Sequence, residues 1–347
     1  MIDFDADVLV LGAGVIGLST AICLAEAGVR VVVAAADPPQ QTTSVAAGAV
    51  WGPHLVGMDE RVERWAAVTL DRLGTLSRPD RAANERPASK RSASERSASE
   101  LTGIVRTTAG VAASRDPRSA PPEFAATAGD LSPCPPGDVP PGYAACWRLT
   151  ATTIAMPGYL GYLAGRLDRA GGHRAFPVRI GTLDEARVLA PSARVIVNCT
   201  GCGARGLVPD PDLVPVRGQV VVTANPGITE FFVGTGTEPG DLTYLFPHGG
   251  VVVLGGTEER GNWSLEPDPQ TAARIVAACS AIEPALCDAP VLEHRVGLRP
   301  ARSKVRLEAE RDGGVTIVHN YGHGGAGVTL SWGCAEEAAG LALAGLA

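Results

Sequence analysis

The sequence predicts an α/β protein in which a split Rossmann-type nucleotide-binding domain is joined to a second, sheet-rich domain. Three observations support this fold class. A strand, a glycine turn, a helix and a strand succeed one another over residues 8–37, a buried strand at 195–198 runs into a turn of small residues, and strand-like apolar runs follow between 216 and 254. At 347 residues the chain has room for about two domains and a large core.

The first of these units carries a G-x-G-x-x-G motif between a strand and a helix. Gly12 permits the tight turn, Gly14 lets the backbone approach a pyrophosphate, and Gly17 lets the helix pack closely on the strand. The helix N-terminus favours negative charge, so little side-chain chemistry is needed to hold a phosphate there. We therefore predict a dinucleotide site formed by Gly12, Ala13, Gly14, Val15, Ile16 and Gly17.

The remainder of this unit supplies a helix end and an acid. Gly28 suits the left-handed position that closes the helix, and a second strand over Val31–Val33 leads to Asp37. Asp37 is predicted to accept hydrogen bonds from ribose hydroxyls, and the alternative is that it caps the turn before Pro38. The motif alone does not separate FAD from NAD.

Composition excludes several classes of partner. A net charge of −7 and a pI near 5.5 argue against a nucleic-acid or anionic-membrane surface. The apolar run from Val8 to Cys23 follows acidic residues and is interrupted by glycines, which fits a buried Rossmann unit better than a signal or membrane segment. Eight cysteines without metal spacing predict neither a metal site nor a disulfide framework, and we expect a cytoplasmic protein.

Farther along, small and low-complexity segments separate the predicted elements. The hydroxyl-rich loop 41–48 is suited to pass close to a cofactor, with a surface turn as the alternative, and the lone His54 is interpreted as structural. Residues 81–100, which include tandem pentads over 91–95 and 96–100, contain too few large apolar residues to form a core. The predicted nucleotide-binding domain is therefore discontinuous and comprises residues 1–50, 151–212 and 300–347. The predicted substrate domain comprises residues 51–150 and 213–299, and residues 81–141 within it form an insertion.

The C-terminal third carries a specific resemblance. Residues 317–335, Ile-Val-His-Asn-Tyr-Gly-His-Gly-Gly-Ala-Gly-Val-Thr-Leu-Ser-Trp-Gly-Cys-Ala, resemble the signature of the D-amino-acid oxidase family. The resemblance extends over nearly the whole chain except roughly residues 80–140. It is supported in order by Thr42-Thr43, Ala46-Ala-Gly48, Asn198-Cys-Thr-Gly201, Arg217-Gly-Gln219, Gly261-Asn-Trp263 and Gly297-Leu-Arg-Pro300.

This resemblance implies a cofactor and a reaction. The cofactor is FAD, the substrate is a D-amino acid whose α-hydrogen leaves as hydride to flavin N5, and O₂ accepts the electrons to give peroxide. It also implies that no side chain acts as acid or base, because the amine enters neutral and the protein supplies grip and orientation.

The resemblance further assigns roles to individual residues. Arg299 is the bidentate carboxylate clamp, Tyr244 donates a second hydrogen bond to the same carboxylate, and the Gly325 carbonyl accepts from the amino group. A helix that starts near Thr329 points its positive end at the flavin. Beyond the glycine motif, the implied FAD-binding residues are Asp37, Thr42, Thr43, Ala47, Gly48, Val178, Gly324, Gly325, Gly327, Val328 and Thr329.

Several alternatives stay open at this point. Arg299 would also fit a surface ion pair and Tyr244 a core position, and His319 and His323 are interpreted as satisfied turn histidines. Some family members carry a second active-site tyrosine where this chain has Gly240. The competing functions are a nicotinamide dehydrogenase, a D-aspartate or glycine/sarcosine oxidase, and a flavoprotein without turnover, and a homodimer also stays open.

Neutral D-amino acids are the expected substrates. The stretch 231–246 contains no Lys or Arg, and its charges, Glu238 and Asp241, would repel an acidic side chain. Arg302 is the nearest cation that would support the opposite preference. The aromatic residues expected to form either an apolar pocket or core are Phe231, Phe232 and Phe246.

Overall fold

The computed structural model describes residues 4–77, 103–122, 125, 130–238 and 240–347. A six-stranded sheet forms one half of the molecule. Its central strand β1 (Val8–Leu11) pairs in parallel with β2 (Val31–Ala34) and β7 (Val195–Asn198). The sheet order is β14 (Arg306–Asp312), β15 (Val315–Tyr321), β7 (Val195–Asn198), β1 (Val8–Leu11), β2 (Val31–Ala34) and β6 (His173–Ala175).

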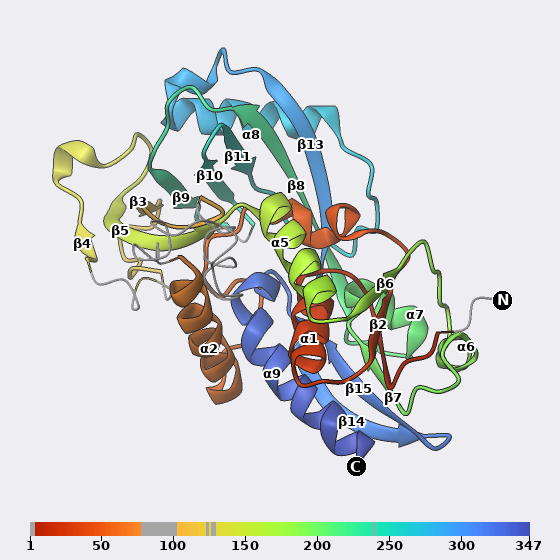
Figure 1. Cartoon of the computed structure of the whole chain (residues 1–347). Helices are drawn as coiled ribbons and strands as arrows, with labels where there is room; N and C mark the ends of the chain where they lie inside the picture. The colour runs from red at the N-terminus through yellow and green to blue at the C-terminus, as the bar shows by residue number, and fades with distance from the viewer. Residues whose placement is uncertain (1–3, 78–102, 123–124, 126–129, 239) are drawn as a thin grey trace, which may run out of the picture.

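Helices cover both faces of this sheet (Figure 1). Successive residues of a strand point to opposite faces, so Val8 and Val10 enter one core cluster and Leu9 and Leu11 enter another. The first face is covered by α1 (Val15–Glu26), α5 (Met156–Arg169) and α9 (Gly327–Leu346), and the second by α6 (Leu183–Leu189) and α7 (Ala204–Leu207).

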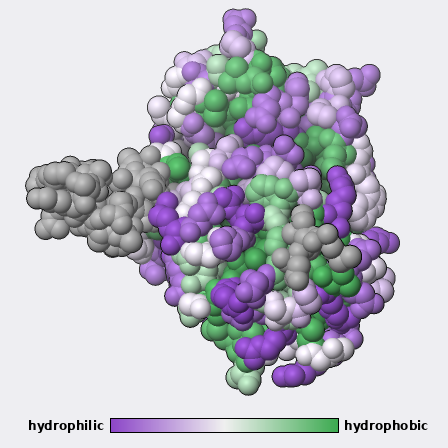
Figure 2. All heavy atoms as spheres, turned by 45° about the vertical axis from the view of Figure 1, so that its right-hand side comes forward, coloured by the Kyte–Doolittle hydropathy of each residue, from purple (hydrophilic) through white to green (hydrophobic). Residues whose placement is uncertain are grey.

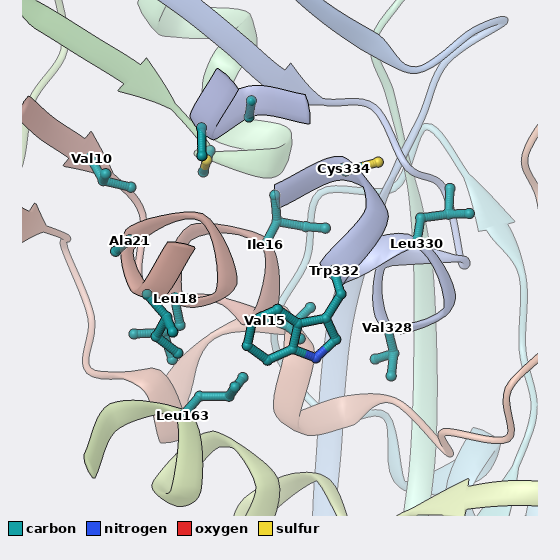
Figure 3. Packing of buried hydrophobic residues seen from close by; sticks show 14 of the residues in the cluster. Val10, Val15, Ile16, Leu18, Ala21, Leu163, Val328, Leu330, Trp332 and Cys334 are labelled. Carbon is teal, nitrogen blue, oxygen red and sulfur yellow. The ribbon is translucent and has the colours of Figure 1, made fainter. Parts of the chain in front are cut away.

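The packing of α1, α5 and α9 is close, as Figure 3 shows for residues of all three helices. Trp332 of α9 is fully buried, and its indole nitrogen donates to the hydroxyl of Tyr159 at 2.8 Å. The helix α2 (Glu60–Ser77) lies against α9 at Gly333, where an added Cβ would come within 2.3 Å of the Trp65 Cα. This close contact fixes the N-terminus of α9, which lines the site described below.

A nine-stranded sheet forms the other half of the molecule. Its interior strand β10 (Leu242–His248) pairs antiparallel with β11 (Val251–Gly255) and β9 (Phe231–Thr235). One face packs on α8 (Pro269–Ile282), whose N-cap Asp268 accepts from the backbone of Gln270 and Thr271. The remaining strands are β3 (Val105–Ser114), β4 (Ser132–Pro133), β5 (Ala145–Ile154), β8 (Val214–Ala224), β9 (Phe231–Thr235), β11 (Val251–Gly255), β12 (Glu259–Arg260) and β13 (Val291–Ala301).

Short 3₁₀ helices occupy some of the connections. They are η1 (Pro39–Gln41), η2 (Thr43–Ala46), η5 (Pro136–Asp138), η6 (Gly201–Gly203) and η7 (Pro284–Leu286).

The predicted α/β fold class, with its Rossmann-type sheet and a second sheet, is confirmed. Gly28 has the predicted positive φ of 84° just beyond α1. The domain boundaries, the homodimer and the cytoplasmic location remain predictions. The pentads at 81–100 lie outside the described residues, as does part of the predicted insertion.

The expectation of no disulfide framework was wrong in one place, because Cys134 and Cys146 form a disulfide. The antiparallel pairing of β4 with β5 places Pro133 opposite Trp147, and this register brings the two cysteines together. Such pairing is a tertiary property that cysteine spacing does not reveal.

Within the described residues, no helix is both long and apolar enough to cross a membrane. The face in Figure 2 is a mixture of hydrophilic and hydrophobic residues.

Candidate active site

One cavity of about 590 Å³ brings together the predicted site residues from both halves of the chain. It extends from the glycine turn after β1 to β10 and β13 of the nine-stranded sheet. Gly17 is the predicted residue that does not line it. The predicted residues that do are Gly12, Ala13, Gly14, Val15, Ile16, Asp37, Thr42, Thr43, Ala47, Gly48, Val178, Tyr244, Arg299, Gly324, Gly325, Gly327, Val328 and Thr329.

The glycine turn after β1 forms a backbone cradle at one end. Gly12 has a φ of 105°, and a Cβ there would lie 2.5 Å from the Cys199 carbonyl oxygen. A Cβ on Gly17 would lie 1.9 Å from the Gly12 oxygen, so Gly17 serves the close packing of α1 and not the lining. The backbone N–H of Val15 donates to the Ser44 hydroxyl at 3.0 Å, which supports the turn from the loop after η1. The cradle therefore offers backbone N–H groups and a helix N-terminus to a phosphate.

Asp37, the predicted ribose-binding residue, and the hydroxyl-rich loop line the cavity beside this cradle. Asp37 is exposed at the cavity edge, where its carboxylate is accessible to a hydroxyl. The Thr42 hydroxyl donates to the Pro39 carbonyl at 2.8 Å, and the Thr43 hydroxyl accepts from the Leu298 N–H at 3.3 Å. Both threonine side chains therefore hold the loop in place as well as lining the cavity. Val178 closes this edge, and its N–H donates to the Ala35 carbonyl at 2.7 Å.

A second glycine run, before α9, forms the opposite wall. Gly324 has a φ of 55°, and a Cβ there would lie 1.8 Å from the Leu55 carbonyl oxygen. The helix begins at Gly327, close to the predicted start, and no side chain caps it. Thr329 exchanges two hydrogen bonds with the Gly52 backbone, at 3.1 and 2.8 Å. The uncapped N-terminus of α9 thus leaves its positive end directed at the cavity.

Unpaired polar atoms on this wall indicate that the cavity is built for a polar ligand. The His323 Nε2 and the Asn320 Oδ1 are buried and have no hydrogen-bond partner among the described residues, and both residues line the cavity. Burial lowers the pKa of His323 to about 3, so its imidazole is neutral and offers a donor or an acceptor without charge. Together with the two glycine cradles, these atoms fit a dinucleotide with a polar ring system.

Arg299 of β13 and Tyr244 of β10 both line the far end of the cavity. The Arg299 Nη1 donates to the Thr257 carbonyl at 2.9 Å, and among the described residues no carboxylate lies within 4.0 Å of its guanidinium. Tyr244 is buried, and Arg299 is close enough to its phenol to act on the pKa of that group. Burial raises the pKa of the Tyr244 phenol, which keeps it protonated as a donor. The pair is therefore a cation and a hydroxyl that can receive a carboxylate.

Neither of the alternatives for these two residues describes the structure fully. Arg299 lines the cavity and is not in a surface ion pair within the described residues. Tyr244 packs as a core residue against Phe246, with ring centroids 5.0 Å apart, and also lines the cavity. A Cβ on Gly48 would lie 3.0 Å from Tyr244 Cε2, so this glycine makes room for the ring.

The charges and aromatic residues expected near the substrate are distributed differently. Asp241 is paired with Arg115 at 3.0 Å, and neither Asp241 nor Glu238 is among the described residues that line the cavity. Arg302 forms an ion pair with Asp210 at 2.9 Å and does not line the cavity. Of the three phenylalanines, Phe246 lines the cavity, whereas Phe231 and Phe232 belong to the core on opposite faces of β9.

Sequence reasoning missed two contributors. His54, interpreted as structural, lines the cavity next to Gly325, whose N–H donates to the His54 carbonyl at 2.9 Å. Glu258, which no motif marked, lies 2.9 Å from the His54 Nε2. The only signal for His54 in the sequence is its position a few residues after the cofactor loop, and nothing in the sequence identifies Glu258 as its partner.

Comparisons with known proteins agree with this geometry. The model of the DAO family, described as FAD dependent oxidoreductase, matches residues 7–341. The chain is 47% identical to a D-amino-acid oxidase of Rubrobacter xylanophilus, with 98% of this chain and 97% of the relative covered. It is 42% identical to a D-amino-acid oxidase of Streptomyces coelicolor, with 97% of each covered.

More distant matches widen the comparison. A D-aspartate oxidase of Homo sapiens is 32% identical, with 97% of this chain and 94% of the relative covered. The crystal structure of glycine oxidase from Geobacillus kaustophilus superposes with a TM-score of 0.76 at 16% identity, covering 99% of this chain and 95% of that one, which shows the shared fold. The full-length family match, the identity to curated relatives and the cavity lined by two glycine cradles place this chain in the DAO family of FAD-dependent oxidoreductases.

Proposed function

We propose that this protein oxidises neutral D-amino acids, with FAD as its cofactor and O₂ as the electron acceptor. Each turnover converts one D-amino acid, one O₂ and one water into a 2-oxo acid, ammonia and hydrogen peroxide. The identity to two D-amino-acid oxidases over nearly the whole chain supports the substrate class.

The observation that carries the proposal is the pairing of Arg299 with Tyr244 at the end of the cavity. A guanidinium whose one side-chain hydrogen bond within the described residues is to the Thr257 carbonyl retains donors for an incoming anion. Its planar fork matches the two oxygens of a carboxylate. The phenol adds a donor from the interior strand β10.

The remaining residues orient the substrate and the cofactor. The Gly12 turn and the α1 N-terminus would hold the phosphates, Asp37 a ribose, and the residues from Gly324 to Thr329 the flavin. FAD supplies, when bound, the acceptor for the hydride that leaves the substrate α-carbon. The Gly325 carbonyl would accept a hydrogen bond from the amino group, and the carboxylate clamp then fixes the handedness of the substrate.

The preference for neutral side chains rests on the supply of cations. Among the described residues Arg299 is the single Lys or Arg that lines the cavity, and the α-carboxylate takes it. The wall nearby is apolar, and Val233, Leu242 and Phe246 form it. A second substrate carboxylate would lose its hydration against this wall without gaining a cation, which is unfavourable.

A substrate panel tests both parts of the proposal. Peroxide release should be observed with D-alanine, D-valine and D-phenylalanine and be absent with their L-enantiomers. At one pH, kcat/KM for each of the three should exceed that for D-aspartate. A higher value for D-aspartate would reject the neutral preference, turnover of glycine or sarcosine alone would assign a different amine oxidase, and binding without any turnover would indicate a non-catalytic flavoprotein.

A further inference from the structure

His54 and Glu258 are far apart in the sequence and come into contact near the substrate end of the cavity. His54 belongs to the loop after Val50, and Glu258 follows β11 of the nine-stranded sheet. The His54 Nε2 lies 2.9 Å from the Glu258 Oε1. An ideal Cβ on Gly325 would lie 2.4 Å from the His54 Cδ2, so the imidazole lies against the glycine that faces the substrate amine in the proposed function.

Glu258 is positioned between the carboxylate clamp and the turn that precedes β10. The residue before it, Thr257, accepts the hydrogen bond from Arg299 at 2.9 Å. On its other side, an ideal Cβ on Gly240 would lie 3.5 Å from the Glu258 Cβ. Because position 240 carries no side chain, the space between this turn and the cavity edge is left to Glu258.

Glu258 also carries a negative charge at neutral pH. The nearby His54 imidazole is the largest influence on the pKa of Glu258, and together with Arg299 it outweighs burial and lowers that pKa from its usual value. The side chain is 16% exposed, so its charge is only partly screened by water. The cationic groups that act on Glu258 are His54 and Arg299, and in the proposed function the α-carboxylate of the substrate takes Arg299.

The direction of a bound substrate side chain follows from the lining. With the α-carboxylate at Arg299 and Tyr244, the side chain meets Val233, Leu242 and Phe246, and the polar edge of that wall is made by His54 with Glu258 behind it. A long side chain can cover the apolar wall with its methylenes and reach the edge with its tip. The charge of that tip then decides the interaction with Glu258.

We propose that Glu258 selects substrates by side-chain charge, disfavouring a second carboxylate and favouring a cationic tip such as that of D-lysine or D-arginine. This inference rests on the proposed D-amino-acid oxidase function. The inference about Glu258 goes beyond that function. The scarcity of cations in the cavity explains a penalty for acidic substrates, but it gives basic substrates no advantage over neutral ones of equal length.

Isosteric substrate pairs measure the charge effect separately from size. The quantities are the ratio of kcat/KM for D-glutamate to that for D-glutamine, and the ratio for D-lysine to that for D-2-aminoheptanoate, which has a methyl group in place of the ammonium. Glu258→Gln keeps the size and shape of the side chain beside His54 and removes the charge. We expect it to raise the first ratio and lower the second, each by about tenfold, which is in range for charges separated by several ångströms in a partly exposed site.

Controls separate charge selection from a structural role. Glu238→Gln removes an exposed carboxylate that, unlike Glu258, forms no ion pair with His54 within the described residues, and it should leave both ratios unchanged. If Glu258 only fixes His54, Glu258→Gln will change kcat/KM for all four substrates equally and the ratios will stay within about twofold of wild type, which overturns the proposal. His54→Gln retains the carboxylate and should preserve the direction of both preferences.

A binding measurement distinguishes failure of this inference from failure of the proposed function. D-lactate and D-malate keep the α-carboxylate and lack the amine, and their dissociation constants follow from the change in flavin absorbance of the holoenzyme. Glu258→Gln should tighten D-malate relative to D-lactate even if no D-amino acid is turned over. An unchanged binding ratio, in a variant that retains its flavin, would reject charge selection by Glu258 whatever the reaction is.

Discussion

The guanidinium of Arg299 lies directly over the backbone of Gly218, on the neighbouring strand β8. A Cβ added to Gly218 would lie 2.5 Å from the Arg299 Nη1 and 2.6 Å from its Cζ. Because both strands are paired along their whole length, the backbone cannot move away, and the arginine would have to shift instead.

Gly218→Ala is therefore expected to damage substrate use without altering any group that touches substrate. Displacement of the clamp by about 1 Å should lower kcat/KM for D-alanine by roughly 10- to 100-fold, mainly through KM. The control is Gly340→Ala in α9, where an added Cβ meets nothing within 4 Å. Steady-state kinetics decide the matter, and equal values for both variants would show that Arg299 adapts freely.

Arg299→Lys should lower kcat/KM far more than its conserved charge suggests. An ammonium cannot reproduce two parallel hydrogen bonds to a carboxylate, and the loss should be about 2–4 kcal/mol in transition-state stabilisation. The measurement is kcat/KM with D-alanine, and Arg118→Lys at a 90% exposed side chain is the control. Near-normal kinetics in the Arg299 variant would remove this residue from the site.

The two glycines Gly12 and Gly28 provide a matched pair for cofactor binding. Both have positive φ, but a Cβ on Gly12 would also lie 2.5 Å from the Cys199 oxygen, whereas a Cβ on Gly28 meets nothing within 4 Å. We expect Gly12→Ala to lose FAD during purification and Gly28→Ala to keep it at a small cost in stability. Acid precipitation should release the wild-type flavin, because we expect the glycine motif and the second glycine run to hold it without a covalent bond. Flavin that stays on the precipitated polypeptide would contradict this.

The disulfide between Cys134 and Cys146 should contribute to stability. It closes a loop with a sequence separation of 12, for which loss of unfolded-state entropy amounts to about 3 kcal/mol. Replacing both cysteines with alanine should lower the free energy of unfolding by about 2–4 kcal/mol in denaturant titrations. The exposed Cys287→Ala serves as the control. Identical midpoints for the double variant and the wild type would assign the disulfide no net effect.

His323 should make the stability of the holoenzyme fall with acid. Burial lowers the pKa of His323 to about 3 in the folded protein, while the unfolded chain binds this proton near pH 6.5. Below pH 6.5 the unfolded state therefore holds one more proton, and stability declines by about 1.4 kcal/mol per pH unit until the folded pKa is reached. His323→Asn should show a slope that is smaller by about one proton, and the exposed His294→Asn should not. Equal slopes would mean that His323 is protonated in the folded state.

The sequence predicts the cofactor-binding end of this protein better than the substrate end, for a physical reason. Gly12 and Gly324 adopt positive φ and Gly17 must clear the Gly12 carbonyl, and a motif records such local requirements. The contact between His54 and Glu258 joins distant parts of the chain through side chains alone, so no local pattern records it. Likewise Asp241 was expected to face the substrate, and only the fold reveals that Arg115 neutralises it.

Tyr244 is on β10, an interior strand hydrogen-bonded on both sides and backed by Cys279 of α8, whose thiol lies 3.3 Å from the Tyr244 carbonyl oxygen. Interior strands exchange their amide hydrogens only when a large part of a sheet opens, whereas turns exchange through local fluctuations. One of the two groups that we propose receive the carboxylate is thus expected to belong to the slowest-opening framework of the molecule. Substrate entry and product exit must then occur by motion of the surrounding turns, while the geometry at Tyr244 stays constant through each turnover.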